Sequence, residues 1–513
     1  MKHLALIFTV LLLVCASLAQ TTAPQPTPPA PPPPVQAPAP PAEKPDKPAA
    51  ETQPETKITP EQAKELLASV DEILQFVSRD TGLPIKHRVN RQLASRAEVV
   101  QYIQDRMKSD EDSRRLERSA VVLKKFGMVP RDFNLRAFLL ELLGEQVAGF
   151  YDSKKKTVFL LDWVEPGQQK PVLAHELTHA LQDQNFGLQK LDKEAKKDDP
   201  TGLEADERIA ARQAMIEGQA MIVLIDYMLQ PLGSSVARQP EVVETVQAGM
   251  TQSGPGMAVY NRAPLFLQQV LLFPYRFGTP FARDLLVKSG REMAFAGALR
   301  NPPRNTRQIM QPETYLAGQY VAPLKPVSFE KLAASYKEWD LSVMGQFDVH
   351  LLMQEYASPE AAEVLSRNWR GGYYWAGLVP QHTKEAEEDP TTADIAVAYV
   401  SKWSDDDAAA QFAGAYAAAL KKRYKVLQPL PGSAPVIAPE PLEPPAPVCP
   451  EGKTCGPEDT PKVTITVWPR LDGRASWSTN EGEVTIEPRG DMVLVTEGLD
   501  ASAVQRVREA VFR

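Results

Sequence analysis

Two histidines four residues apart, with a glutamate between them, are the residues of this chain best suited to chemistry. They lie in the stretch Pro171-Val-Leu-Ala-His175-Glu176-Leu-Thr-His179-Ala-Leu-Gln-Asp183. On a helix, positions i and i+4 lie on one face, so the two imidazoles can point at a single zinc ion. Glu176 projects beside that point, where it can take a proton from a water that the ion activates. The spacing therefore predicts a metal centre with His175 and His179 as ligands and Glu176 as the catalytic general base.

The His-Glu-x-x-His pattern rarely arises by chance in a chain of this composition. The chain has six histidines, so a chance match is on the order of 1 in 200. Apolar flanking residues favour a helix, and Pro171 suits a helix start. The alternative is a histidine pair that is merely packed in a core or on a helix surface.

A third ligand is predicted on a second helix, over residues 202–230. Its residues 214–225 are apolar almost all round, so Glu217 would be buried there and would need a partner. Zinc is such a partner, and an internal ion pair between Glu217 and an arginine is the alternative. Gly218 and Ala220 beside the acid would let two helices approach closely. Asp206 is the second choice of ligand, Glu207 the third, and Gln213 a second-shell candidate.

A hydrolytic zinc site also needs a group that stabilises the developing oxyanion. The candidates are Tyr275, Tyr315 and Arg276, and the sequence does not choose among them. Each also suits a packed aromatic or a surface charge.

The active-site stretch His175-Glu-Leu-Thr-His179-Ala is similar to the active-site helix of the thermolysin-like gluzincins, a group of zincin metallopeptidases. A downstream glutamate on a second helix fits the same clan. The chain departs from the thermolysin type at Met221, where that type carries an acid that orients a histidine. The separation between His179 and Glu217 is also longer.

A wider pattern resembles a group of exported bacterial proteins classed as zinc metallopeptidases. It runs from Gly149-Phe-Tyr-Asp through the His-Glu-x-x-His helix to Ile216-Glu-Gly-x-Ala, and the resemblance covers about residues 130–320. It implies a gluzincin-like site with Zn²⁺ but no particular substrate.

The elements that must position these residues form a predicted zincin-like domain over residues 58–328, mainly helical with one small β-hairpin. Helices are expected at about 59–77, 96–108, 110–126 and 135–146, and later at 240–249, 264–273 and 280–299. The hairpin spans 147–161, directly before the active-site helix. In zincins an edge strand in this order lines the cleft, and an extended peptide can pair with it. The polar residues 187–201 and the proline-punctuated residues 305–315 are expected to be loops.

The rest of the chain predicts a smaller second domain, so the expected fold class is α+β. Strands and helices alternate over residues 329–428. Nine prolines between Pro429 and Pro450 mark a linker over 429–460, which ends in Cys449 and Cys455, a plausible disulfide pair. Short strands and a helix over 461–513 are expected to complete the sheet that begins in 329–428.

The N-terminus predicts export. Residues 1–19 have the charge, apolar core and small residues of a signal peptide cut after Ala19, and acylation at Cys15 is the alternative. Thirteen prolines between Ala23 and Ala49 make residues 20–57 an extended tether, which would hold the body away from a cell-wall or envelope surface. The net charge of −8 argues against a nucleic-acid partner.

These observations predict an exported, periplasmic or extracellular zinc metallopeptidase that hydrolyses a peptide or protein substrate. One alternative is a catalytically weak or inactive binding or assembly protein of the cell envelope on a peptidase fold. Another is a wall-associated structural protein whose histidines are only packed.

Overall fold

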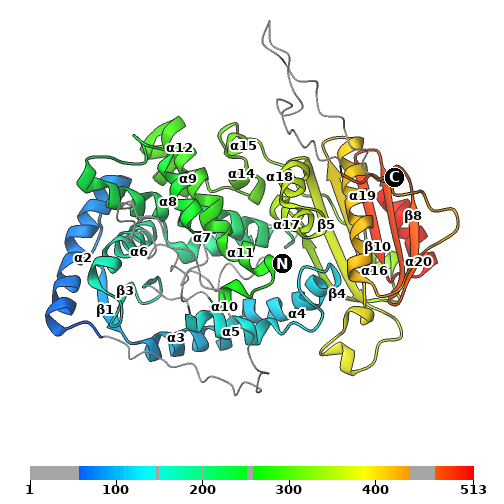
Figure 1. Ribbon diagram of the computed structural model, residues 1–513, viewed down its shortest axis with the longest axis horizontal. Coiled ribbons are helices and arrows are strands. Elements are labelled where there is room, and N and C mark those ends of the chain that lie inside the picture. Colours follow the sequence, from blue (N-terminus) through cyan, green and yellow to red (C-terminus); the bar gives the residue numbers. More distant parts are fainter. Residues whose placement is uncertain (1–56, 110, 146–148, 198–201, 251–257, 439–467) are drawn as a thin grey trace, which may run out of the picture.

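The computed structural model describes residues 57–109, 111–145, 149–197, 202–250, 258–438 and 468–513 (Figure 1). The predicted leader and tether, most of the second linker and the cysteine pair lie outside these residues. A helical region is followed by a large antiparallel sheet with its own helices, so the expected α+β class is confirmed. Among the described helices, none combines the length and the apolar character that crossing a bilayer requires.

In the described part of the chain, four helices precede the candidate site and agree with the predicted segments. They are α2 (Pro60–Thr81), α3 (Arg96–Ser109), α4 (Glu111–Lys125) and α5 (Leu135–Glu145). At the start of α2, Thr59 and Gln62 form a reciprocal capping box, which satisfies two backbone N–H groups that the helix leaves unpaired. Its apolar stripe, including Leu66, Val70 and Val77, is buried and packs against the active-site helix.

The predicted β-hairpin is present and belongs to a three-stranded sheet. Strands β2 (Phe150–Asp152) and β3 (Thr157–Leu161) pair antiparallel, and β1 (Asn90–Ala94) pairs parallel to β3 on its other side. The sequence pattern missed β1 because its residues are mostly polar and its partner is distant in the chain. The order β1-β3-β2 leaves β2 at the edge of the sheet.

The His-Glu-x-x-His helix α6 (Pro166–Phe186) begins five residues before the proline that suggested its start. Pro166 occupies the first helical position, and the Gln169 side chain ties the first turn to Leu161 and Val164. Pro171 therefore lies inside the helix, where its missing N–H removes one backbone hydrogen bond. The second site helix, α8 (Ala205–Leu229), is close to its predicted range.

The expected loop over residues 187–201 is wrong for most of its length. Residues 188–197 form helix α7 (Leu188–Lys197), in which Leu191 and Ala195 are buried. Its lysines and acids suggested a solvated loop, but they occupy the outer face of a short amphipathic helix. Residues 198–201 lie outside the described part of the chain.

Helices after α8 complete the helical region. They are α9 (Val242–Met250), α10 (Ala258–Asn261), α11 (Leu265–Arg276), α12 (Gly278–Glu292), α13 (Ala298–Arg300), α14 (Thr306–Met310) and α15 (Pro312–Leu316), with the 3₁₀ turn η2 (Gln230–Leu232) and the π-helical turn η3 (Met293–Gly297). The expected loop over 305–315 thus contains two short helices, the first capped by Asn305.

The backbones of α8 and α12 meet where glycine was expected to allow a close approach. A Cβ atom on Gly218 would lie 2.0 Å from the carbonyl oxygen of Gly278, and one on Gly278 would lie 2.0 Å from that of Ala214. Only two glycines fit this crossing, and Glu217 is adjacent to it.

Gly218→Ala is therefore expected to lower the free energy of unfolding by about 3 kcal/mol, because the clash is with backbone and cannot be relieved by a side-chain rotation. Chemical denaturation monitored by circular dichroism would measure this. Gly167→Ala is the control, since Gly167 is helical with open space around it. Equal stabilities of the two variants would contradict the close crossing.

Seven strands form one antiparallel sheet in the order β4-β5-β6-β10-β9-β8-β7. The strands are β4 (Lys337–Val343), β5 (Trp369–Leu378), β6 (Ile395–Trp403), β7 (Leu427–Pro429), β8 (Ala475–Thr479), β9 (Gly482–Arg489) and β10 (Met492–Glu497). The pairing of β6 with β10 joins the segments before and after the second linker within this sheet.

Helices cover both faces of this sheet (Figure 1). Helices α16 (Phe329–Leu332) and α20 (Ala501–Val511) pack on one face, over Trp375 and Ala398. The other face packs against α17 (Gln346–Tyr356) and α19 (Asp406–Arg423), with Tyr399 and Phe412 in contact. The remaining elements are α18 (Pro359–Arg367), η4 (Glu385–Glu387) and η5 (Thr392–Asp394).

Candidate metal centre

The crossing of α6 and α8 brings three potential metal ligands together. The Nε2 atoms of His175 and His179 are 3.0 Å apart, and Glu217 Oε2 lies 3.1 Å from the first and 3.4 Å from the second. Two ligands about 2.05 Å from a tetrahedral zinc ion lie about 3.3 Å from each other. The three donor atoms therefore already have the spacing of one face of a zinc coordination tetrahedron.

The centre is fully enclosed in this structure. His175, Glu176, His179 and Glu217 are each 0–2 % exposed. Within the described part of the chain, Glu176 Oε1 and Glu217 Oε1 have no hydrogen-bond partner. A buried carboxylate oxygen without a partner is costly, so the donor set fits a cation and a polar ligand that would satisfy these atoms.

Burial and mutual charge set the protonation states of these groups in the metal-free protein. Burial lowers the pKa of His175 to about 4. Burial acts in the same direction on His179, but the adjacent Glu217 carboxylate outweighs it and raises the pKa of His179 to about 9. Burial opposes ionisation of Glu217, yet His179 holds its pKa down at about 2. Without metal, a protonated His179 thus pairs with an ionised Glu217.

Zinc binding is therefore expected to release the His179 proton, because the imidazole must be neutral to bind metal. His179 is protonated below its pKa, so zinc affinity should rise by about tenfold per pH unit from about pH 6 to about pH 8. Calorimetry in buffers of different ionisation enthalpy would count the released protons. An affinity that stays constant over this range would contradict the protonated state.

A chain of amides fixes the orientation of His179. Its Nδ1 atom lies 2.9 Å from Gln182 Oε1, and Gln182 Nε2 donates to the Ile216 carbonyl and to Gln219 Oε1. Gln219 in turn donates to the carbonyls of Ala294 and Phe295 in the π-helical turn η3. The carbonyls of the π-helical turn thus hold Gln219, which in turn holds Gln182 against the His179 ring.

Gln182→Leu is expected to weaken zinc binding by about 10- to 100-fold, because the His179 ring would lose its orienting partner. A competition titration with a zinc-chelating dye measures this effect. Gln168→Leu, on the exposed side of the same helix, should leave the affinity unchanged. Equal zinc affinities of the two variants would show that Gln182 does not orient His179.

The general-base candidate is held by the edge strand. The backbone N–H of Tyr151 in β2 donates to Glu176 Oε2 at 2.7 Å, and the Tyr151 hydroxyl donates to Asp183 Oδ2 at 2.8 Å. Lys156 also donates to Asp183. The hairpin is therefore hydrogen-bonded to α6 through the Tyr151 N–H, the Tyr151 hydroxyl and the Lys156 amine. Burial raises the pKa of Glu176 to about 8 in the metal-free protein.

The other candidate ligands lie elsewhere. Among the described residues, the only group of three or more acids, histidines or cysteines close enough to share a metal is His175, His179 and Glu217. Glu207 accepts from the N–H and hydroxyl of Thr306, so it caps α14. Asp206, one residue earlier, is not part of the group. Gln213 is half-buried, and the amide that reaches the histidine is that of Gln182.

The three oxyanion candidates have other contacts. The Tyr315 hydroxyl donates to the carbonyl of Asn301. Arg276 donates to the Gln269 side chain, and Tyr275 is buried in the core. The structure gives no reason to choose one of them.

Comparisons of this chain with protein-family models, curated proteins and solved structures find no match. The three donor atoms nevertheless indicate a metal site. Two imidazoles and one carboxylate match a protein ligand set known from zinc enzymes, and a second carboxylate, that of Glu176, lies next to them.

Proposed function

We propose that this protein is an exported, zinc-dependent metallopeptidase that hydrolyses bonds in peptides or proteins. His175, His179 and Glu217 would hold the zinc ion, and Glu176 would act as general base and then as general acid. The observation that supports this most strongly is the convergence of the three donor atoms within 3.0–3.4 Å, next to the Glu176 carboxylate. The proposal of export rests only on the predicted signal peptide over residues 1–19.

The zinc ion would polarise the scissile carbonyl and lower the pKa of water to about 7. Glu176 would receive the proton of the attacking water at Oε1, because Tyr151 holds Oε2. It would then pass that proton to the leaving nitrogen. Burial raises the pKa of Glu176 to about 8 in the metal-free protein, and bound zinc would lower it so that the ionised carboxylate can accept a proton near neutral pH.

The edge strand supports a peptide as the substrate. Tyr151 directs its N–H away from β3 and towards Glu176, so the outer edge of β2 adjoins the centre. An extended peptide paired along this edge would bring its carbonyls to the metal ligands. Every second side chain of such a peptide would lie on the face of the small sheet that carries Phe150 and Phe159. There, a cavity of about 810 Å³ is lined by Tyr102, Phe150 and Phe159.

The test is turnover of a broad peptide library by the zinc-loaded full chain, with and without a chelator. Cleavage that stops with the chelator and returns with zinc is the expected result. Zinc-independent cleavage would contradict the proposal.

One observation favours a second function. All four central side chains are at most 2 % exposed, so a peptide carbonyl can reach them only if the covering segments move. A protein that holds zinc but cleaves nothing, and serves binding or assembly in the cell envelope, needs no such opening. Stoichiometric zinc without turnover of any library peptide would favour this function.

A further inference from the structure

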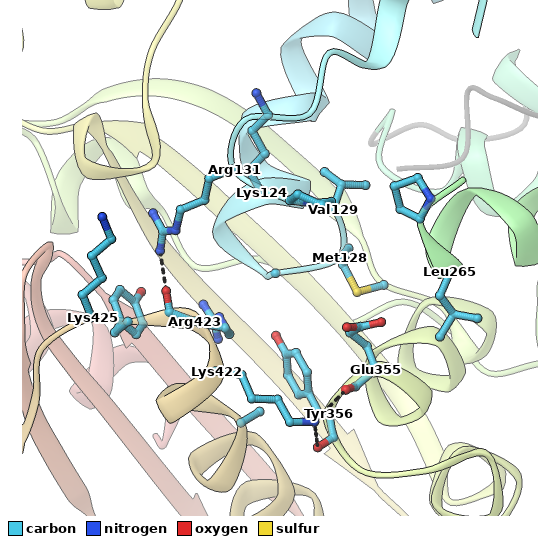
Figure 2. A pocket seen from close by; sticks show the side chains of 15 residues that line it. Lys124, Met128, Val129, Arg131, Leu265, Glu355, Tyr356, Lys422, Arg423 and Lys425 are labelled. Carbon is cyan, nitrogen blue, oxygen red and sulfur yellow. Dashed lines mark hydrogen bonds between the residues drawn. The ribbon is translucent and has the colours of Figure 1, made fainter. Parts of the chain in front are cut away.

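A second cavity, of about 540 Å³, lies between the helical region and the large sheet (Figure 2). Its walls come from the turn between α4 and α5, the start of α11, and the ends of α17 and α19. None of the residues of the metal centre lines it. Its volume is in the range of cavities that bind small organic molecules.

The lining of this cavity is strongly cationic. Five basic side chains and one carboxylate, Glu355, take part in it, in a chain whose net charge is −8. The basic residues are Lys124, Arg131, Lys422, Arg423 and Lys425. Arg131 and Arg423 pair with Glu481 and Glu497, and the three lysines add further positive charge, so the cavity favours anions.

Arg423 has hydrogen-bonding capacity that the protein leaves unused. Its side chain is 4 % exposed, and Nη2 donates to both oxygens of Glu497 and to the Lys125 carbonyl. In the described part of the chain, its Nε and Nη1 have no hydrogen-bond partner. The rings of Tyr356 and Tyr424, within 5.7 Å of the guanidinium carbon, supply no conventional acceptor. Both N–H groups are closed off from solvent, so in this arrangement the guanidinium adds positive charge to this wall but offers a ligand no direct hydrogen bond.

The opposite wall carries three apolar side chains and the Glu355 carboxylate. Figure 2 shows Val129, Met128 and Leu265 on one side of the cavity, and Arg131, Arg423 and Lys425 on the other. Lys422 lies at the rim, where its amine donates to the carbonyls of Glu355 and Tyr356. A ligand that uses both walls needs an anionic head and an apolar chain.

We propose that this cavity binds an amphiphilic anion, an alkyl chain that ends in a carboxylate or a phosphate. The head would lie against Arg423, Lys422 and Lys425, and the chain against Met128, Val129 and Leu265. The site is separate from the metal centre and does not depend on peptidase activity.

Isothermal titration of the full chain with decanoate and decyl phosphate, below their micellar concentrations, tests the proposal. We expect saturable binding of either or both, which also tells which head group is preferred. Acetate, inorganic phosphate and decyl maltoside should bind at least about tenfold more weakly, since each lacks the chain or the charge. No saturable binding of either amphiphile, or equal binding of any of the three controls, would overturn it.

Matched variants locate the ligand. Lys422 and Lys425 are exposed, so the double variant Lys422→Glu/Lys425→Glu should fold and should weaken amphiphile binding by at least about tenfold. Lys421→Glu, on the same helix and also exposed but outside the cavity, should leave it unchanged. Leu265→Ser should also weaken the binding of both amphiphiles, because it removes an apolar contact with the alkyl chain. Undiminished binding by the double variant and by Leu265→Ser would contradict the assignment of this cavity.

Discussion

Glu176→Gln is expected to retain zinc while it loses about 10³-fold or more of the rate of peptide hydrolysis. The amide can still accept the Tyr151 N–H through its oxygen, so the local structure should persist. It cannot take a proton from water at neutral pH, and the general-base step is lost. The measurement is kcat/KM on a cleaved library peptide together with the zinc content of both proteins.

The matched control is Glu165→Gln, at the exposed start of the same helix. It removes one carboxylate from α6 without touching the centre, so its activity should equal that of the wild type. Hydrolysis by Glu176→Gln at the wild-type rate would exclude Glu176 as the base.

Glu217→Gln is expected to weaken zinc binding by more than about 100-fold, the upper limit for loss of a second-shell group, because it removes a first-shell charged ligand. The same change removes the ionic partner of His179, so the pKa of that histidine in the metal-free protein should fall towards or below its ordinary value. Metal competition and NMR titration of the histidine would report both effects.

A buried carboxylate on the same helix provides the control. Asp226 accepts the Val236 N–H near the end of α8, and asparagine can keep that bond. Asp226→Asn should therefore bind zinc as the wild type does. If it loses zinc to the same degree as Glu217→Gln, the effect arises from the stability of α8 and not from ligation.

Much of the centre could be predicted because its signals are local. The four-residue spacing of His175 and His179 needs only a helix, and Glu217 is recognisable as the acid within the mostly apolar residues 214–225. Gln182 carried a usable signal as well, since it is three residues after His179 and so lies on the same face. That signal was missed in favour of Gln213.

The rest depends on contacts between segments far apart in the chain. Gln219 can hold Gln182 in place because η3, about 75 residues later, presents the carbonyls of Ala294 and Phe295 to it. Strand β1 exists through its parallel pairing with β3, and no local pattern specifies that partner. The complete burial of the centre likewise results from how whole helices pack, which periodicity alone does not reveal.

Charge patterns caused the clearest error. The lysine-rich residues after Gly187 resemble a solvated loop by composition, yet Leu191 and Ala195 anchor them as helix α7. The helical spacing of Leu191 and Ala195 covers only one turn, so the charged composition of the segment favoured a loop prediction.

The most direct test of the central claim is metal analysis of the full chain after equilibration with zinc and removal of the unbound ion. We predict one zinc ion per chain in the wild type, and close to none when His175, His179 and Glu217 are all replaced by alanine. A wild-type protein that retains no zinc would contradict the metal centre, and with it the proposed peptidase.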